Sequence, residues 1–182
     1  MKATGIVRRI DDLGRVVIPK EIRRTLRLRE GTPLEIFTDR EGEIILKKYS
    51  PMVELTAFAG QYADAMAQST GMMVCITDRD QVVAAAGGAR KELLQKPISH
   101  QLENGIQERA AITAGKDDKG FISLTSEPLE GITAQVIAPI ICEGDAIGAV
   151  IILSREPRVR FGEMEMKLAA TAAGFLGRQM ES

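Results

Sequence analysis

The sequence predicts an α+β protein in two parts: a small β-rich head over residues 1–50 and a body over residues 51–182, where helices pack on an antiparallel sheet. Residues 1–50 hold twelve basic and eight acidic side chains, a net charge of +4, whereas residues 51–182 hold twelve and seventeen, a net charge of −5. Ser50-Pro51 lies where the charge changes, and proline disfavours a helix or sheet running through it. Turn residues separate short apolar runs in both parts, which indicates hairpins.

The first fifteen or so residues of the head predict a hairpin. Gly5 to Ile10 and Val16 to Ile18 are apolar and rich in β-branched residues, and Asp11-Asp12-Leu13-Gly14 between them is typical of a turn. Two strands are therefore expected on either side of that turn.

A short helix and a second hairpin should complete the head. Pro19 fits the first helical position, where its missing N–H costs nothing, and Ile22 and Leu26 lie four residues apart on one face. Gly31 is expected to end this element. The second hairpin is predicted over residues 34–38 and 43–49.

The head concentrates positive charge. Its first 29 residues carry nine basic against three acidic side chains, and seven of the nine are arginine, which suits bidentate contacts with phosphates and guanine edges. A nucleic acid is the expected partner. The plainer interpretation is a solvated face with ion pairs to Asp11, Asp12 and Glu21.

Fifty residues bury too little surface to offset their conformational entropy. The head has no cysteine, so neither a disulfide nor a cysteine-based metal site can stabilise it. We therefore expect two chains to share one core as an obligate dimer, which would also suit a two-fold DNA site.

The body should open with a helix ended by Gly71, since residues 55, 58, 59, 62 and 66 form one apolar stripe. Strands are expected over 72–77 and 81–86, followed by a helix over 92–109 that is broken near Pro97. A strand over 121–125, a strong hairpin over 132–142 and 146–154, and a helix over 162–180 follow.

The closing helix is rich in small residues, namely Ala169, Ala170, Ala172, Ala173, Gly174 and Gly177. Small side chains allow helices to approach closely, which favours a bundle contact between chains. Packing against the body's own sheet explains the same composition, and the two roles could use different faces.

Other features favour neither catalysis nor a membrane. Cys75 and Cys142 lie in apolar strings that predict buried, inert thiols, although a redox pair is the alternative. His100 is the only histidine, which excludes His-rich zinc sites. Gly87-Gly88 could bind an anion or simply form a turn. No apolar run is long enough to span a membrane. Two cysteines cannot form a disulfide framework, so a reducing cytoplasm is the expected location, and no cofactor or metal is expected.

The segment from Gly5 to Leu26, with Leu13-Gly14-Arg15-Val16-Val17-Ile18-Pro19 at its centre, resembles the swapped-hairpin DNA-binding domain of AbrB-type transition-state regulators. The resemblance extends through Pro33 to Ile36 and Ile44 to Tyr49. The body, with Ala172-Ala173-Gly174-Phe175-Leu176 near its end, is similar to the sensor half of a sporulation regulator of endospore-forming bacteria.

This resemblance implies that two heads interleave their hairpins and that arginines contact DNA. Carried over by position, the DNA-binding residues are Arg8, Arg15, Arg23 and Arg24, with Lys2 and Arg9 as supporting charges. It also implies a GAF-like body whose terminal helices join chains into a homotetramer, and which could sense a small-molecule effector.

We therefore expect a DNA-binding transcriptional regulator, an activator or repressor of sporulation genes that is selective for DNA sequence or shape and is not an enzyme. One rival is a thiol-dependent GAF-type reductase with a basic appendage. The other is an antitoxin-like DNA-binding protein, for which an acidic disordered tail would be the expected toxin-binding element.

Overall fold

The computed structural model describes residues 5–49, 56–88 and 90–181. The chain divides into two compact units, Met1–Tyr49 and Ser50–Ser182, and each is described by itself. Within the described residues, no helix combines the length and the apolar character that a membrane span requires.

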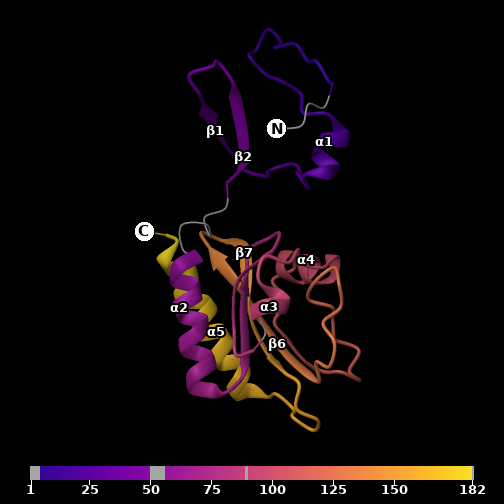
Figure 1. Ribbon diagram of the computed structural model, residues 1–182, viewed down its shortest axis with the longest axis vertical. Coiled ribbons are helices and arrows are strands. Elements are labelled where there is room, and N and C mark those ends of the chain that lie inside the picture. Colours follow the sequence, from indigo (N-terminus) through magenta and orange to yellow (C-terminus); the bar gives the residue numbers. More distant parts are fainter. Residues whose placement is uncertain (1–4, 50–55, 89, 182) are drawn as a thin grey trace. The chain divides into compact units, whose positions relative to one another are not determined.

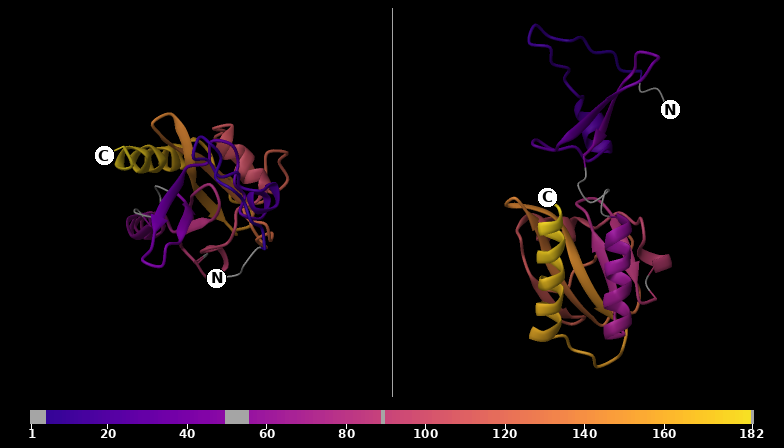
Figure 2. Two further views of the ribbon diagram at one scale, coloured as in Figure 1. Left: turned by 90° about the horizontal axis from the view of Figure 1, so that it is seen from above. Right: turned by 90° about the vertical axis from the view of Figure 1, so that its left-hand side faces the viewer.

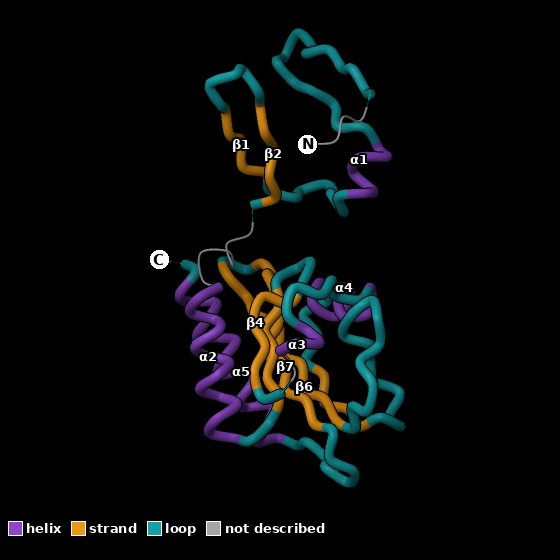
Figure 3. The backbone as a smooth tube through the Cα atoms, viewed as in Figure 1, coloured by secondary structure: helices purple, strands orange, loops and turns teal. Residues whose placement is uncertain are grey.

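The head contains one short helix and one hairpin (Figure 3). Helix α1 (Lys20–Thr25) is followed by strands β1 (Leu34–Thr38) and β2 (Ile44–Lys48), which pair antiparallel with Leu34 opposite Lys48 and Thr38 opposite Ile44. The predicted second hairpin is therefore confirmed, with its second strand one residue shorter at each end.

The first predicted hairpin forms its turn but not its strands. The Asp11 N–H donates to Arg15 O at 3.0 Å, the Gly14 N–H donates to Asp11 O at 3.0 Å, and Gly14 has a φ of 76°. Among the described residues, however, Gly5 to Ile10 and Val16 to Ile18 belong to no sheet. The strand prediction is wrong for this single chain, because two arms that pack against no further strand are marginally stable in water.

Both ends of α1 differ from the prediction. Pro19 is the residue before the helix rather than its first residue, with ψ at 148°. The helix ends at Thr25, well before Gly31, because Arg27 adopts a left-handed φ of 52° and the Leu28 N–H donates to Arg23 O at 2.7 Å. This is the hydrogen-bond pattern of a Schellman motif, formed here by an arginine where glycine is usual.

The body is a three-layer unit around a five-stranded antiparallel sheet (Figure 1). The strand order is β4-β3-β7-β6-β5. The strands are β3 (Met73–Thr77), β4 (Val82–Ala86), β5 (Ile112–Gly115), β6 (Ala134–Cys142) and β7 (Asp145–Ser154). The helices are α2 (Thr56–Thr70), α3 (Arg90–Leu93), α4 (His100–Gln107) and α5 (Glu163–Gln179).

Each face of the sheet has its own core. Helices α2 and α5 lie side by side on one face (Figure 2), where they pack on Val150 and Ile152 of β7. Helices α3 and α4 cover the other face, where Ile151 and Leu153 of the same strand are buried. Alternate side chains of β7 thus enter opposite cores. This arrangement explains why the strand sequences are continuous apolar runs rather than alternating patterns.

Three details of the body differ from the prediction. The helix predicted over 92–109 is two short helices, α3 and α4, with residues 94–99 between them. Strand β5 was not predicted, and residues 121–125 form no strand, only an isolated bridge between Thr125 and Ile98. Side chains help to hold this segment in place of a ladder: the Ser99 hydroxyl donates to Ser123 O. The fully buried Gln135 amide faces the backbone N–H and C=O of Ile122 at 2.7 and 3.0 Å.

The small residues of α5 divide between two environments. Ala169, Ala172, Ala173 and Gly177 are buried against the body's own sheet, whereas Ala170 and Gly174 are exposed. At Gly177 the helix approaches β6 so closely that an added Cβ would lie 2.1 Å from Ile141 O. Packing on the sheet therefore accounts for the buried members of this set. Leu55, part of the stripe predicted for α2, lies outside the described residues.

Replacing Gly177 with alanine should destabilise the body. The new methyl would collide with backbone rather than with a movable side chain, and such overpacking costs about 1–3 kcal/mol. Gly174→Ala is the matched control, because its Cβ would meet nothing within 4 Å and alanine has the higher helix propensity. Thermal unfolding should show a lower Tm for Gly177→Ala and an unchanged or higher Tm for Gly174→Ala. Equal Tm values would contradict this account of the close contact.

Candidate nucleic-acid interface

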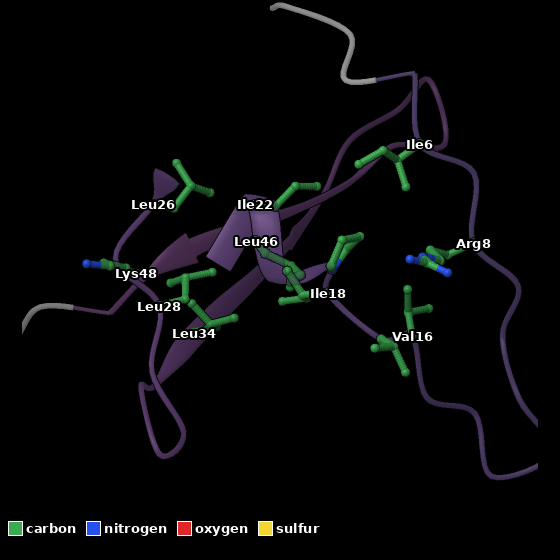
Figure 4. A pocket seen from close by; sticks show the side chains of 12 residues that line it. Ile6, Arg8, Val16, Ile18, Ile22, Leu26, Leu28, Leu34, Leu46 and Lys48 are labelled. Carbon is green, nitrogen blue, oxygen red and sulfur yellow. The ribbon is translucent and has the colours of Figure 1, made fainter. Parts of the chain in front are cut away.

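The head encloses an open apolar groove with a volume of about 540 Å³ (Figure 4). The residues before and after the first turn supply one side of it, and α1 with the β1–β2 hairpin supplies the other. The lining residues are Ile6, Arg8, Val16, Val17, Ile18, Pro19, Ile22, Leu26, Leu28, Leu34, Leu46 and Lys48.

Most apolar side chains of the head remain in contact with water. Val7 is 90% exposed, Leu13 is 70% exposed and Val17 is 68% exposed. Among the described head residues, only Pro19 is buried, and no Ile, Leu or Val side chain is. A single head therefore has no hydrophobic core of its own, and its groove presents the surface that a core would use.

The predicted DNA-binding residues lie on three segments of the head. Arg8 and Arg9 lie on the extended segment before the first turn, Arg15 closes that turn, and Arg23 and Arg24 lie on α1. All five are exposed. Lys2 lies outside the described residues.

Arg8 is the one of these arginines that also lines the groove. Ile6 and Arg8 line it whereas Val7 does not, which is the alternation of side chains expected along extended backbone. Arg8 thus belongs both to the lining of the groove and to the set of exposed basic residues.

Helix α1 separates apolar from basic side chains. Ile22 and Leu26 line the groove, as their four-residue spacing predicts. Arg23 and Arg24 are exposed and lie outside the groove lining. The helix therefore presents guanidinium groups to solvent while its other face contributes to the groove.

Arg15 is held within the first turn by Asp11. The Arg15 Nε–H donates to Asp11 Oδ2 at 2.9 Å, and the Arg15 backbone N–H donates to Oδ1 at 2.7 Å. These hydrogen bonds, the backbone one above all, hold the pKa of Asp11 below its ordinary value. The Arg15 side chain nevertheless remains 68% exposed, so the ion pair leaves it accessible to a ligand.

The two cysteines cannot work as a pair. Cys75 is buried in the core beneath α3 and α4, whereas Cys142 belongs to the core beneath α2 and α5, on the opposite face of the sheet. Burial raises the pKa of Cys75 to about 12, and burial together with nearby carboxylates such as Glu143 raises the pKa of Cys142. Raised pKa values keep both sulfurs as poorly nucleophilic thiols.

The other residues considered for catalysis, anion binding or metal binding have structural roles instead. His100 lies on the surface of α4, with Nδ1 3.2 Å from Glu103 Oε2. A Cβ on Gly87 would meet Met72 O at 2.3 Å, so this glycine is needed where the chain turns past β3. No group of potential metal ligands occurs among the described residues.

Comparison with known proteins finds a relative that matches the whole chain. It is 54% identical over 181 residues to stage V sporulation protein T of Bacillus subtilis (strain 168), covering 100% of this chain and 99% of that protein. Transition state regulatory protein AbrB of the same organism is 42% identical over 104 residues, which are 57% of this chain and 96% of that protein.

The two parts match separate families. Residues 54–181 match the family "Stage V sporulation protein T C-terminal, transcription factor", and residues 7–53 match "Antidote-toxin recognition MazE, bacterial antitoxin". A solved GAF-B domain of DevS from Mycobacterium smegmatis superposes with a TM-score of 0.53 at 13% identity, covering 69% of this chain and 93% of that one. This likeness shows that the body has a GAF-like fold.

Sequence reasoning missed part of this site. It treated Asp11 as a turn residue and as a possible ion-pair partner, but not as a partner of Arg15 in particular. It assigned Arg8 to DNA contact, and Ile22 and Leu26 to one apolar helix face, but it did not predict that they line one groove. A signal for Asp11 is present in the sequence, because Asp11-Asp12-Leu13-Gly14 and Asp39-Arg40-Glu41-Gly42 repeat the same Asp-x-x-Gly pattern.

The thiol of Cys75 should be inert in the folded protein. In a Cys142→Ser variant at pH 8.5, a colorimetric disulfide reagent should react within minutes only after unfolding in urea. The pKa of Cys75 in the folded protein is raised from the ordinary 9.0 to about 12, so the thiol of the unfolded chain loses its proton at a lower pH. The free energy of unfolding should therefore decrease as the pH rises from about 9 to about 12. Rapid stoichiometric labelling without urea would contradict the burial of Cys75.

Proposed function

The chain belongs to the family of stage V sporulation protein T transcription factors, and we propose that it regulates sporulation genes by binding double-stranded DNA through a dimer of heads. The observation that carries this proposal is the coincidence of an open apolar groove and exposed arginines in a head without a core. Activation at some promoters and repression at others are both compatible with such binding.

The groove supports dimerisation through the heads. It joins apolar side chains from the first turn, α1 and the second hairpin, and the first hairpin has arms that pair with no strand among the described residues. The arms of a second head would supply both the missing strands and the missing core. Burial of this apolar surface would stabilise the dimer by about 25 cal/mol for each Å² removed from water.

The exposed arginines support DNA binding by the dimer. Arg8, Arg9, Arg15, Arg23 and Arg24, with Lys2, are the proposed contact residues. Two copies double the positive field and match a two-fold site. If eight phosphates are contacted for each dimer, the slope of log affinity against log salt concentration should be about −7. Readout of DNA shape and of base edges would both operate on such a surface.

We also propose that the body joins head dimers into a tetramer. Phe58 and Tyr62 of α2 and Phe175 of α5 form an aromatic cluster, in which the Tyr62 and Phe175 rings stack at 5.6 Å between centroids. Phe175 is 40% exposed and Met164 of α5 is 79% exposed. A bundle of these helices would cover them and raise the effective concentration of the second head dimer on DNA.

The GAF-like fold supports a further role as a receptor for a small-molecule effector. A metabolite that raises the Tm of the body would identify that effector, whereas no response across a metabolite library would leave the body with an architectural role. The DNA-bound protein would act in the cytoplasm.

The rival functions receive less support. A thiol reductase using both cysteines is disfavoured because they lie on opposite faces of the sheet. The antitoxin description matches residues 7–53 alone, and the described residues that follow form a packed domain rather than an acidic tail. Transcriptional regulation without catalysis is the function that the geometry supports best.

Removing one guanidinium from each head should weaken DNA binding. Arg15→Ala and Arg23→Ala each eliminate an exposed positive group. In gel shifts on promoter fragments, each should lower affinity about ten-fold or more at moderate salt and make the salt slope shallower by one to two units for each dimer. Arg158→Ala, in the loop between β7 and α5, is the control. Undiminished binding by both head variants would contradict the proposal.

A charge placed in the groove should separate the heads. Leu46→Glu puts a carboxylate among the lining side chains, where burial without a partner is costly. Arg40→Gln makes the same change of one charge unit in the turn of the second hairpin, outside the groove. Sedimentation should show half the wild-type mass for Leu46→Glu, together with loss of DNA binding, and wild-type mass for Arg40→Gln. An unchanged mass for Leu46→Glu would rule out the groove as the dimer contact.

A further inference from the structure

The two turns of the head are built in the same way. In the first, Asp11 Oδ1 accepts from the N–H groups of Leu13 at 3.0 Å and Arg15 at 2.7 Å. The backbone N–H of Asp11 also donates to Arg15 O at 3.0 Å. One carboxylate oxygen is therefore enough to organise this five-residue turn.

The second turn repeats this geometry position by position. Asp39 Oδ1 accepts from the N–H groups of Glu41 at 3.0 Å and Glu43 at 2.9 Å. The Asp39 N–H donates to Glu43 O at 3.2 Å. Glycines with φ of 76° and 84° occupy the fourth position of the two turns. The second turn thus shows what the Asp-x-x-Gly pattern achieves by itself.

The two turns differ at the fifth position and at the outer oxygen of the aspartate. In the first turn Asp11 Oδ2 accepts from Arg15 Nε at 2.9 Å. In the second turn the fifth residue is Glu43, whose side chain offers no such donor. The contact between Oδ2 and Nε is therefore an addition to the turn and not a requirement for it.

We propose that Asp11 is a positioning residue for DNA recognition, which holds the Arg15 guanidinium by its Nε edge and so increases discrimination between DNA sequences. The inference rests on the proposed function, since Arg15 must contact DNA. Asp11 would thus contribute to DNA recognition although it is negatively charged and lies among basic residues.

The contact with Asp11 uses the Nε group of Arg15 and not its two Nη groups. Arginine has five N–H donors, and the two Nη groups form the fork that binds guanine O6 and N7 in a bidentate manner. Asp11 occupies Nε, while the side chain of Arg15 stays 68% exposed. An arginine already fixed at Nε loses less rotamer freedom when its fork docks. An exposed ion pair of this kind adds little to folding stability, so orientation is its main effect.

The charge of Asp11 acts in the same direction. Hydrogen bonds from the Arg15 backbone, and then from its side chain and from Leu13, lower the pKa of Asp11, so the carboxylate stays ionised at neutral pH. A negative charge beside Arg15 weakens every contact that depends on phosphate attraction alone. Selectivity is a difference of affinities, and a penalty on non-specific binding increases it.

The test uses the full-length protein with Asp11→Asn and its matched control Asp39→Asn. Both changes keep an Oδ1 acceptor for the turn and remove one negative charge. The probes are the duplex most enriched by the wild-type protein from a random pool and a scrambled duplex of the same composition. For Asp11→Asn we expect affinity for the scrambled duplex to rise, and the ratio of the two affinities to fall about five-fold or more, a loss within the range of one bidentate base contact.

For Asp39→Asn the affinity ratio should stay at the wild-type value, and the Tm of both variants should match that of the wild-type protein. An Arg15→Lys variant, which keeps the charge but loses the fork, should lower the ratio as well. The double variant Asp11→Asn/Arg15→Lys should then lose no more selectivity than Arg15→Lys alone.

Three outcomes would overturn the inference separately from the proposed function. If Asp11→Asn keeps the wild-type affinity ratio while Arg15→Ala still weakens binding, then Asp11 serves the turn only. A loss of selectivity of the same size in both Asp variants would also reject positioning, because net charge would explain it. If Arg15→Ala alone binds as well as wild type, positioning of Arg15 by Asp11 is rejected while the proposed function still rests on Arg23→Ala. If the wild-type protein binds no duplex, both proposals fail together.

Discussion

The head cannot bury its own apolar side chains, and the rest of its organisation depends on this constraint. About fifty residues can bury only a modest fraction of the surface that the unfolded chain exposes. Here the aliphatic residues spread over two turns, six helical residues and one hairpin, and Pro19 is the only buried residue among those described. Under the proposed function, the stability of such a unit comes from a second chain. Its folded state and its oligomeric state would then be the same equilibrium, as for obligate dimers.

The body satisfies the opposite condition. Its five strands are covered on both faces, and each face is closed by its own pair of helices. Residues such as Gly177 and Gly148 allow backbone to approach backbone at distances that any side chain would prevent. The body can therefore fold on the strength of its own core, which makes it suited to join other units. The exposed Met164 and Phe175 of α5, together with the half-buried Tyr62 of α2 that stacks on Phe175, are where the proposed contact would form.

Local pattern predicted the elements whose partners lie within the chain. The second hairpin, α2, the β6–β7 hairpin and α5 all follow from periodicity and turn chemistry. The predictions failed where stability comes from elsewhere. The first hairpin lacks strand partners in one chain, and residues 121–125 are held by Ser99 and Gln135 rather than by a ladder. Helix α1 is terminated by Arg27 in a left-handed conformation. Sequence reasoning looks for a glycine at such a position and therefore placed the helix end at Gly31.

The candidate site was predictable in its charge and not in its geometry. Arginine content and motif placed five described guanidinium groups on the head, and all are exposed. What the sequence did not reveal is that Arg8 lines the same groove as Ile18, Ile22 and Leu46. Under the proposed function, filling that groove with a second chain fixes the backbone that carries Arg8 and Arg15. DNA that binds the ordered pair of heads must then stabilise the dimer by the same factor by which dimerisation raises DNA affinity. Affinity for DNA and affinity between heads would therefore be coupled, and apolar residues that touch no phosphate would contribute to DNA affinity alongside the arginines.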